Sequence, residues 1–105
     1  AVAAASPAIW PSYEAMKLGP GDAFDSAEDF AANDVFAGVG KLDNAAVRID
    51  CGEQDPFYTY VSQFVDSFPP EQKPEGGFGP GDHSGSYWQT LQSAQIAFFG
   101  RAFSD

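Results

Sequence analysis

The most regular strand pattern in the chain spans Ala45–Gly52. Its apolar and charged side chains alternate in the order Val47, Arg48, Ile49, Asp50 and Cys51. Such alternation is typical of a β-strand. A turn sequence ends the strand, so Asp55 falls in the loop just past its carboxyl end. In open α/β sheets that edge is where ligands and catalytic groups gather, although Asp-Pro is also a common turn.

The remaining patterns predict further strands and helices around this segment. The apolar run Ala1–Trp10 predicts a short buried strand that leads into a loop, as in the middle of a parallel sheet. A short edge strand is expected near Gly77-Phe78. Helices are predicted in three segments: from Ser26 to Gly38 or Gly40, from Phe57 to Phe68, and from Ser84 or Ser86 to Ala102. The breaker Gly19-Pro20-Gly21 predicts a loop.

Strands and helices therefore alternate along the chain, which indicates an α/β fold with parallel strands. We find no internal repeat and no linker, so residues 1–105 are expected to form one domain with an incomplete sheet. The strand predicted in Ala1–Trp10 and the last predicted helix would both be poorly covered by other elements in a chain of this length. We therefore expect either self-association or a partner that carries the missing part of the fold.

The charge balance excludes several classes of partner. Fifteen acidic residues oppose five basic ones, a formal net charge of −10, which repels nucleic acids and anionic membranes. No apolar run is long enough to span a bilayer. Five acids near the predicted first helix do not match calcium-loop spacing, so no metal is expected there: Asp22, Asp25, Glu28, Asp29 and Asp34. No cofactor is expected either, and the compartment stays open because Cys51 is the one cysteine.

The only histidine, His83, lies in a glycine-rich loop directly before the last predicted helix. By itself this is most simply a surface turn. However, a helix of about eleven residues is roughly 16 Å long, which matches a five-residue strand. The chain that leaves the sheet edge at Asp55 therefore returns to the same edge at His83. An Asp that orients a His in this chain order is two-thirds of a Ser-His-Asp triad.

The third member of such a triad is not apparent in the sequence. There is no G-x-S-x-G motif, and Ser84 is most simply a helix cap. Cys51 is a poor substitute, because burial in a strand raises the pKa of a thiol and leaves it inert.

Four segments together resemble the C-terminal part of the putative esterase family of α/β-hydrolases, which includes esterase D and the antigen 85 mycolyltransferases. They are residues 3–10, 24–36, 47–57 and 81–88, with the signatures G-x-x-D-P-F and G-x-H-x-x-x-Y-W. The resemblance implies that Asp55 is the triad acid and His83 the triad base. It further implies that Ser6 and Trp10 line the substrate site, and that the serine elbow and oxyanion hole precede Ala1.

We therefore expect a C-terminal part of a serine carboxylesterase-like hydrolase that acts on an ester or acyl small molecule and is inactive without the upstream serine. Two alternatives remain open: an acyltransferase of the mycolyltransferase type, and a non-catalytic binding module on a hydrolase scaffold. An independent small α/β binding protein is the least favoured interpretation. The family resemblance also suggests a secreted or cell-envelope location.

Overall fold

The computed structural model describes residues 1–19 and 22–104, so Pro20 and Gly21 of the expected breaker lie outside the described residues. The elements in chain order are β1 (Val2–Ala5), α1 (Tyr13–Lys17), α2 (Ala27–Ala32), the 3₁₀ turn η1 (Val39–Leu42), β2 (Val47–Gly52), α3 (Tyr58–Asp66), the 3₁₀ turn η2 (Pro70–Gln72), β3 (Glu75–Gly79) and α4 (Gly85–Phe103). The strands form one parallel sheet in the order β1-β2-β3. This confirms the predicted alternation of helices with parallel strands. The first strand, however, was expected to be buried in the middle of the sheet, whereas β1 lies at an edge of this sheet and none of its residues is fully buried.

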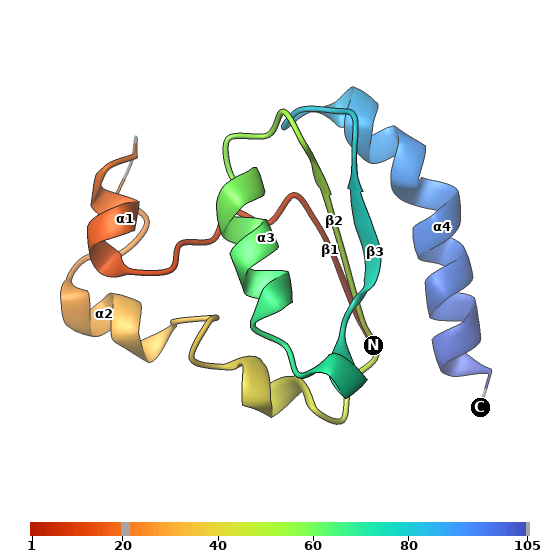
Figure 1. The fold of residues 1–105 in the computed structure, drawn as a ribbon, viewed down its shortest axis with the longest axis horizontal. Coiled ribbons are helices and arrows are strands. Elements are labelled where there is room, and N and C mark those ends of the chain that lie inside the picture. The colour runs from red at the N-terminus through yellow and green to blue at the C-terminus, as the bar shows by residue number, and fades with distance from the viewer. Residues whose placement is uncertain (20–21, 105) are drawn as a thin grey trace.

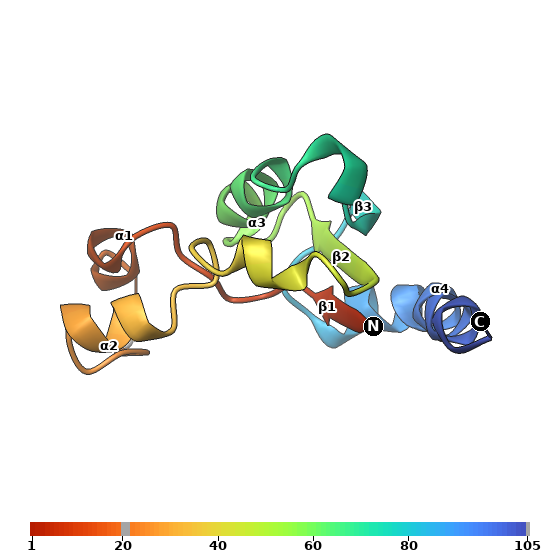
Figure 2. The same ribbon diagram turned by 90° about the horizontal axis from the view of Figure 1, so that it is seen from below.

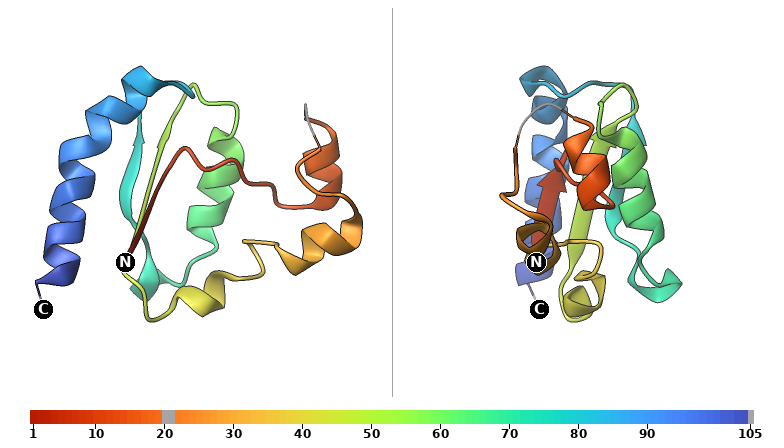
Figure 3. Two further views of the ribbon diagram at one scale, coloured as in Figure 1. Left: turned by 180° about the vertical axis from the view of Figure 1, so that it is seen from behind. Right: turned by 90° about the vertical axis from the view of Figure 1, so that its left-hand side faces the viewer.

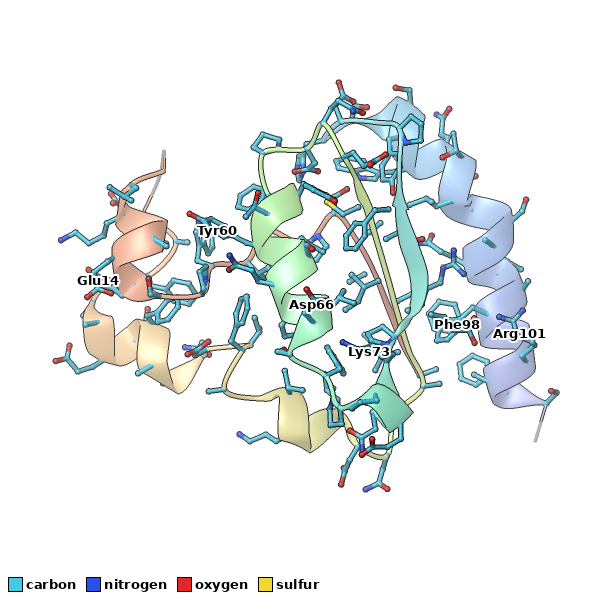
Figure 4. All side chains as sticks on the ribbon, viewed as in Figure 1. Glu14, Tyr60, Asp66, Lys73, Phe98 and Arg101 are labelled. Atoms are coloured by element: carbon cyan, nitrogen blue, oxygen red, sulfur yellow. The ribbon has the colours of Figure 1, made fainter. Side chains whose placement is uncertain are left out.

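The sheet is covered on its two faces by different helices (Figures 1 and 2). α3 lies on one face, where Ile49 and Cys51 of β2 join Val61 and Phe64 of α3 in the main core. α4 lies on the other face, and its Phe98 points toward the sheet (Figure 4). Among the described residues, none of the helices combines the length and the apolar character that a membrane span requires.

The face of β2 that meets α4 carries a buried ion pair. Arg48 Nε donates to Asp50 Oδ2 at 2.8 Å, and the two side chains are 14% and 5% exposed. The predicted alternation is therefore correct, but its charged side chains are covered. A strand between two others with a helix on each face leaves both of its sides buried.

Helices α1 and α2 lie beside the sheet, on the side away from α4 (Figure 3). We call these two helices, together with the described residues between them, the α1–α2 lobe. Phe30 joins them, because its ring packs edge-on against Tyr13 and Phe24. Trp10 connects the lobe to the start of α3, since its ring packs edge-on against Phe24, which precedes α2, and against Phe57, which precedes α3.

Two details of the lobe differ from the prediction. α1 was not anticipated, although Ser12 caps it by accepting from the Ala15 amide at 3.1 Å. α2 ends at Ala32 rather than at Gly38 or Gly40. The reason is local: Asn33 donates to the Asp29 carbonyl oxygen, and the Asp34 carboxylate accepts from the Phe36 amide. Such side-chain bonds offer the backbone an alternative to the helix.

The last helix begins as predicted and packs less fully than predicted. Ser84 is its N-cap. Residues Tyr87, Leu91, Ala94, Phe98 and Ala102 recur at helical spacing and would form one buried stripe; of these, Tyr87 and Phe98 are buried, whereas Ala94 is exposed. Ile96 and Phe103 are 72% and 74% exposed, so part of the apolar surface of α4 faces outward.

Candidate functional site

The loops that follow β2 and β3 meet at the carboxyl edge of the sheet and bring Asp55 and His83 together. Nδ1 of His83 lies 2.9 Å from Oδ2 of Asp55, although the two residues are 28 positions apart. β2 is parallel to β3, with Gly52 opposite Gly79, so both loops leave the sheet at one level. The structure thus places this pair where the strand-length argument predicted it.

The carboxylate of Asp55 is fixed on both oxygens. Its side chain has no exposed surface; Oδ2 faces His83, and Oδ1 accepts from the Phe57 amide at 2.8 Å. Because an ionised carboxylate only accepts, we assign the proton of neutral His83 to Nδ1. Nε2 then carries the free lone pair, and the His83 side chain is 38% exposed. The ring therefore presents a base to solvent and a donor to Asp55.

Backbone contacts hold the two loops against each other. The Glu53 amide donates to the Gly79 carbonyl oxygen at 2.8 Å, and the Gln54 amide donates to that of Gly81 at 2.9 Å. Gln54 Oε1 accepts from the Gly81 amide at 2.7 Å. Close approach requires glycine on both sides: a Cβ on Gly52 would lie 2.2 Å from the Gly81 oxygen. Gly81 itself has φ of +146°, and a Cβ there would lie 2.3 Å from Tyr87.

Two aromatic rings flank the imidazole. Trp88 is nearly perpendicular to it, with ring centroids 5.2 Å apart, and Phe57 is tilted at 5.8 Å. Trp88 lies one turn into α4, and Phe57 directly precedes α3. Trp88 ends the G-x-H-x-x-x-Y-W signature but was not predicted as a site residue. Its signal was position, since it falls five residues after His83 and so one helical turn beyond the Ser84 cap.

Ser6 and Trp10, the residues expected to bind substrate, lie at different distances from the pair. Ser6 follows β1 at the same sheet edge and is 4% exposed. Its Oγ accepts a hydrogen bond from Trp88 Nε1 at 2.9 Å. Trp10 contacts Phe57 rather than His83, with centroids 5.5 Å apart. Direct contact of either residue with a substrate stays a prediction.

Cys51 lies beneath this edge and is fully buried. Its pKa is raised to about 11, chiefly by burial and then by the negative charge of Asp55, while hydrogen bonding from Ser6 acts in the opposite direction. The thiol therefore stays protonated near neutral pH, which agrees with the predicted inertness.

The described residues do not supply a nucleophile to the pair. Within the described residues, the His83 ring makes one hydrogen bond, and its partner is Asp55. Ser84 instead accepts from the Tyr87 amide as a helix cap and bonds to Ser86. The described part of the chain also contains no cluster of three potential metal ligands.

A small apolar cavity of about 50 Å³ lies in the α1–α2 lobe beside Trp10, away from the pair. Its walls include Ala8, Phe24, Phe30 and Val35. Neither Asp55 nor His83 lines it, so it is not the place where the histidine would act.

Searches against protein-family models, curated proteins and solved structures found no match to this chain.

Proposed function

We propose that this chain supplies the acid and the base of a serine hydrolase triad that cleaves carboxylic esters, in the manner of the putative esterase family that the sequence resembles. The observation that carries the proposal is the buried Asp55 carboxylate on Nδ1 of a partly exposed His83. The nucleophilic serine would come from residues that precede Ala1.

In the proposed reaction, Nε2 of His83 removes the proton from the serine hydroxyl as the serine oxygen attacks the ester carbonyl. The tetrahedral intermediate collapses when Nε2 returns this proton to the alkoxide leaving group, which departs as an alcohol. Water then attacks the acyl-serine with His83 again as base, and the proton finally returns to the serine oxygen. Asp55 stays ionised and stabilises the imidazolium that forms in each half.

The burial of Asp55 supports this role over that of a surface turn. A turn-forming Asp-Pro needs no partner beyond its own backbone, and Asp55 does make that contact through Oδ1. Its second oxygen, Oδ2, binds a histidine from another loop, and the Asp55 side chain has no exposed surface. An isolated ionised carboxylate is costly to bury, so the bond to His83 offsets part of that cost.

The test is to prepare the protein with the residues that precede Ala1 and to label it with a fluorophosphonate probe. We expect one upstream serine to be labelled, p-nitrophenyl acetate to be hydrolysed, and both reactions to be lost in His83→Ala. Glu53→Gln is the matched control, because it changes an exposed acid of the same loop as Asp55. Absence of both labelling and hydrolysis in the unmodified protein would refute the proposal.

The same experiment separates hydrolysis from acyl transfer. Both begin with the acyl-serine, and they differ in whether water or an alcohol accepts the acyl group. Added glycerol should leave the free acid as the main product of an esterase, whereas an acyltransferase would yield the glycerol ester.

A further inference from the structure

The hydrogen bond between Trp88 and Ser6 joins two segments that are 82 residues apart, and it lies directly beside the candidate base. Neither residue forms a hydrogen bond with Asp55, yet the ring of Trp88 packs against that of His83, with ring centroids 5.2 Å apart.

Ser6 is held in an unfavourable backbone conformation. Its φ is +52°, and it is the one residue other than glycine with a positive φ among residues 1–19 and 22–104. A serine in the left-handed region costs free energy, and such residues persist where the surrounding structure fixes them, often at functional sites. Its amide donates to the Asp50 carbonyl oxygen at 2.8 Å, which continues the pairing of β1 with β2 past the end of β1. The strained turn thus presents the Ser6 hydroxyl at the carboxyl edge of the sheet.

The hydroxyl fixes the indole of Trp88. A tryptophan ring can rotate about two bonds, and the 2.9 Å bond from Nε1 to a buried acceptor selects one orientation. In that orientation the indole stands at 84° to the imidazole of His83. Phe57 lies against the imidazole as well, and its own amide is bonded to Asp55. The imidazole of His83 therefore contacts two aromatic rings, and its Nδ1 faces the carboxylate of Asp55.

From this geometry we propose that Ser6 and Trp88 are positioning residues for His83: the Ser6 hydroxyl orients the Trp88 indole, and the indole holds the imidazole so that Nδ1 faces Asp55 and Nε2 faces the reacting group. This role rests on the proposed function for its catalytic meaning. The orientation of the ring itself can be measured on this chain without a nucleophile.

The measurement is the tautomer of His83 by long-range ¹H–¹⁵N correlation NMR at pH 9, where histidine is ordinarily neutral. His83 is the only histidine, so its ring signals need no further assignment. We expect the Nδ1–H form to dominate in the unmodified chain. In Ser6→Gly and Trp88→Leu, the ratio of the Nδ1–H to the Nε2–H form should fall about threefold to tenfold, the range that loss of one ordinary hydrogen bond gives.

Ser6→Gly separates positioning from stability. Glycine accepts a positive φ without strain, so the relief of strain at this position should offset much of the stability that is lost with the hydrogen bond to Trp88. Faster solvent exchange of the Trp88 Nε1 proton should accompany the change of tautomer ratio. Trp10→Phe is the matched control and also assigns the two indole signals, because Trp10 is the other tryptophan and contacts Phe57 rather than His83.

A tautomer ratio within twofold of the unmodified chain in both folded variants would overturn the proposal. So would an equal change in Trp10→Phe. If the ratio falls as expected but the longer protein hydrolyses no ester, then the proposed function fails while the positioning of His83 stands.

Discussion

Replacement of Gly52 by alanine is the most direct perturbation of the contact between the two site loops. The added Cβ would lie 2.2 Å from the Gly81 carbonyl oxygen, 2.4 Å from its carbon and 3.1 Å from the Asp82 amide nitrogen. All three atoms belong to the backbone, so no side-chain rotation relieves the overlap. To restore a contact of 3.4 Å, the 81–82 loop must move away by about 1.2 Å.

Such a movement breaks the bonds that join the loops. The bonds between Gln54 and Gly81, at 2.9 Å and 2.7 Å, both run across the opened gap. Two ordinary hydrogen bonds contribute about 1 kcal/mol each. Residual strain from overpacking adds at least about 1 kcal/mol. We therefore expect Gly52→Ala to lower the free energy of unfolding by about 3 kcal/mol.

The assay is urea unfolding followed by circular dichroism, with the midpoint falling and the slope unchanged. Gly79→Ala is the matched control, because a Cβ at Gly79 meets no atom within 4 Å. It should change the free energy of unfolding by less than about 0.5 kcal/mol. A Gly52→Ala variant as stable as the unmodified chain, or a Gly79→Ala variant as damaged as Gly52→Ala, would refute the steric argument.

Three further predictions follow from the site and the sheet. Asp55→Asn in the protein with its upstream residues should lower kcat for ester hydrolysis by about four orders of magnitude, because an amide stabilises the wrong tautomer of His83; an unchanged kcat would remove Asp55 from the triad. Arg48→Leu should cost about 3 kcal/mol in chemical unfolding, since it leaves the buried Asp50 carboxylate unpaired, and the double variant Arg48→Leu/Asp50→Leu should recover most of that loss. Burial raises the pKa of Cys51 from 9.0 to about 11 and that of Tyr87 from 10.0 to about 12, so the folded state binds these protons more tightly and stability should fall as pH rises above about 9. Unfolding midpoints between pH 8 and 11 check this, and Cys51→Ala should flatten the slope.

The sequence predicted the sheet and the Asp55–His83 pair because both depend on short-range patterns. The alternation of apolar and charged residues predicted β2. The expected lengths of the next helix and strand predicted that the chain leaves the sheet edge at Asp55 and returns to the same edge at His83. The prediction of this return needed only the lengths of the elements within one β-α-β unit.

What the sequence did not predict depends on contacts between distant or competing groups. The bond from Trp88 to Ser6 spans 82 residues and follows no periodicity. The burial of Asp50 depends on how α4 lies over the sheet, whereas an isolated strand pattern assigns charged residues to solvent. α2 ended early because the Asn33 side chain bonds to the backbone of its own helix, a local effect that outweighed the glycines downstream.

The separation between the α1–α2 lobe and the sheet has a consequence for how the molecule opens. Helices α1 and α2 pair with no strand of the sheet, and Trp10 packs between Phe24 of the lobe and Phe57. In contrast, β2 is paired on both sides and buried on both faces. Amide hydrogen exchange should therefore occur in two regimes, with α1 and α2 exchanging through local opening and β2 only through global unfolding. Because Asp55 and His83 are attached to β2 and its neighbour, the pair would survive fluctuations that melt the lobe.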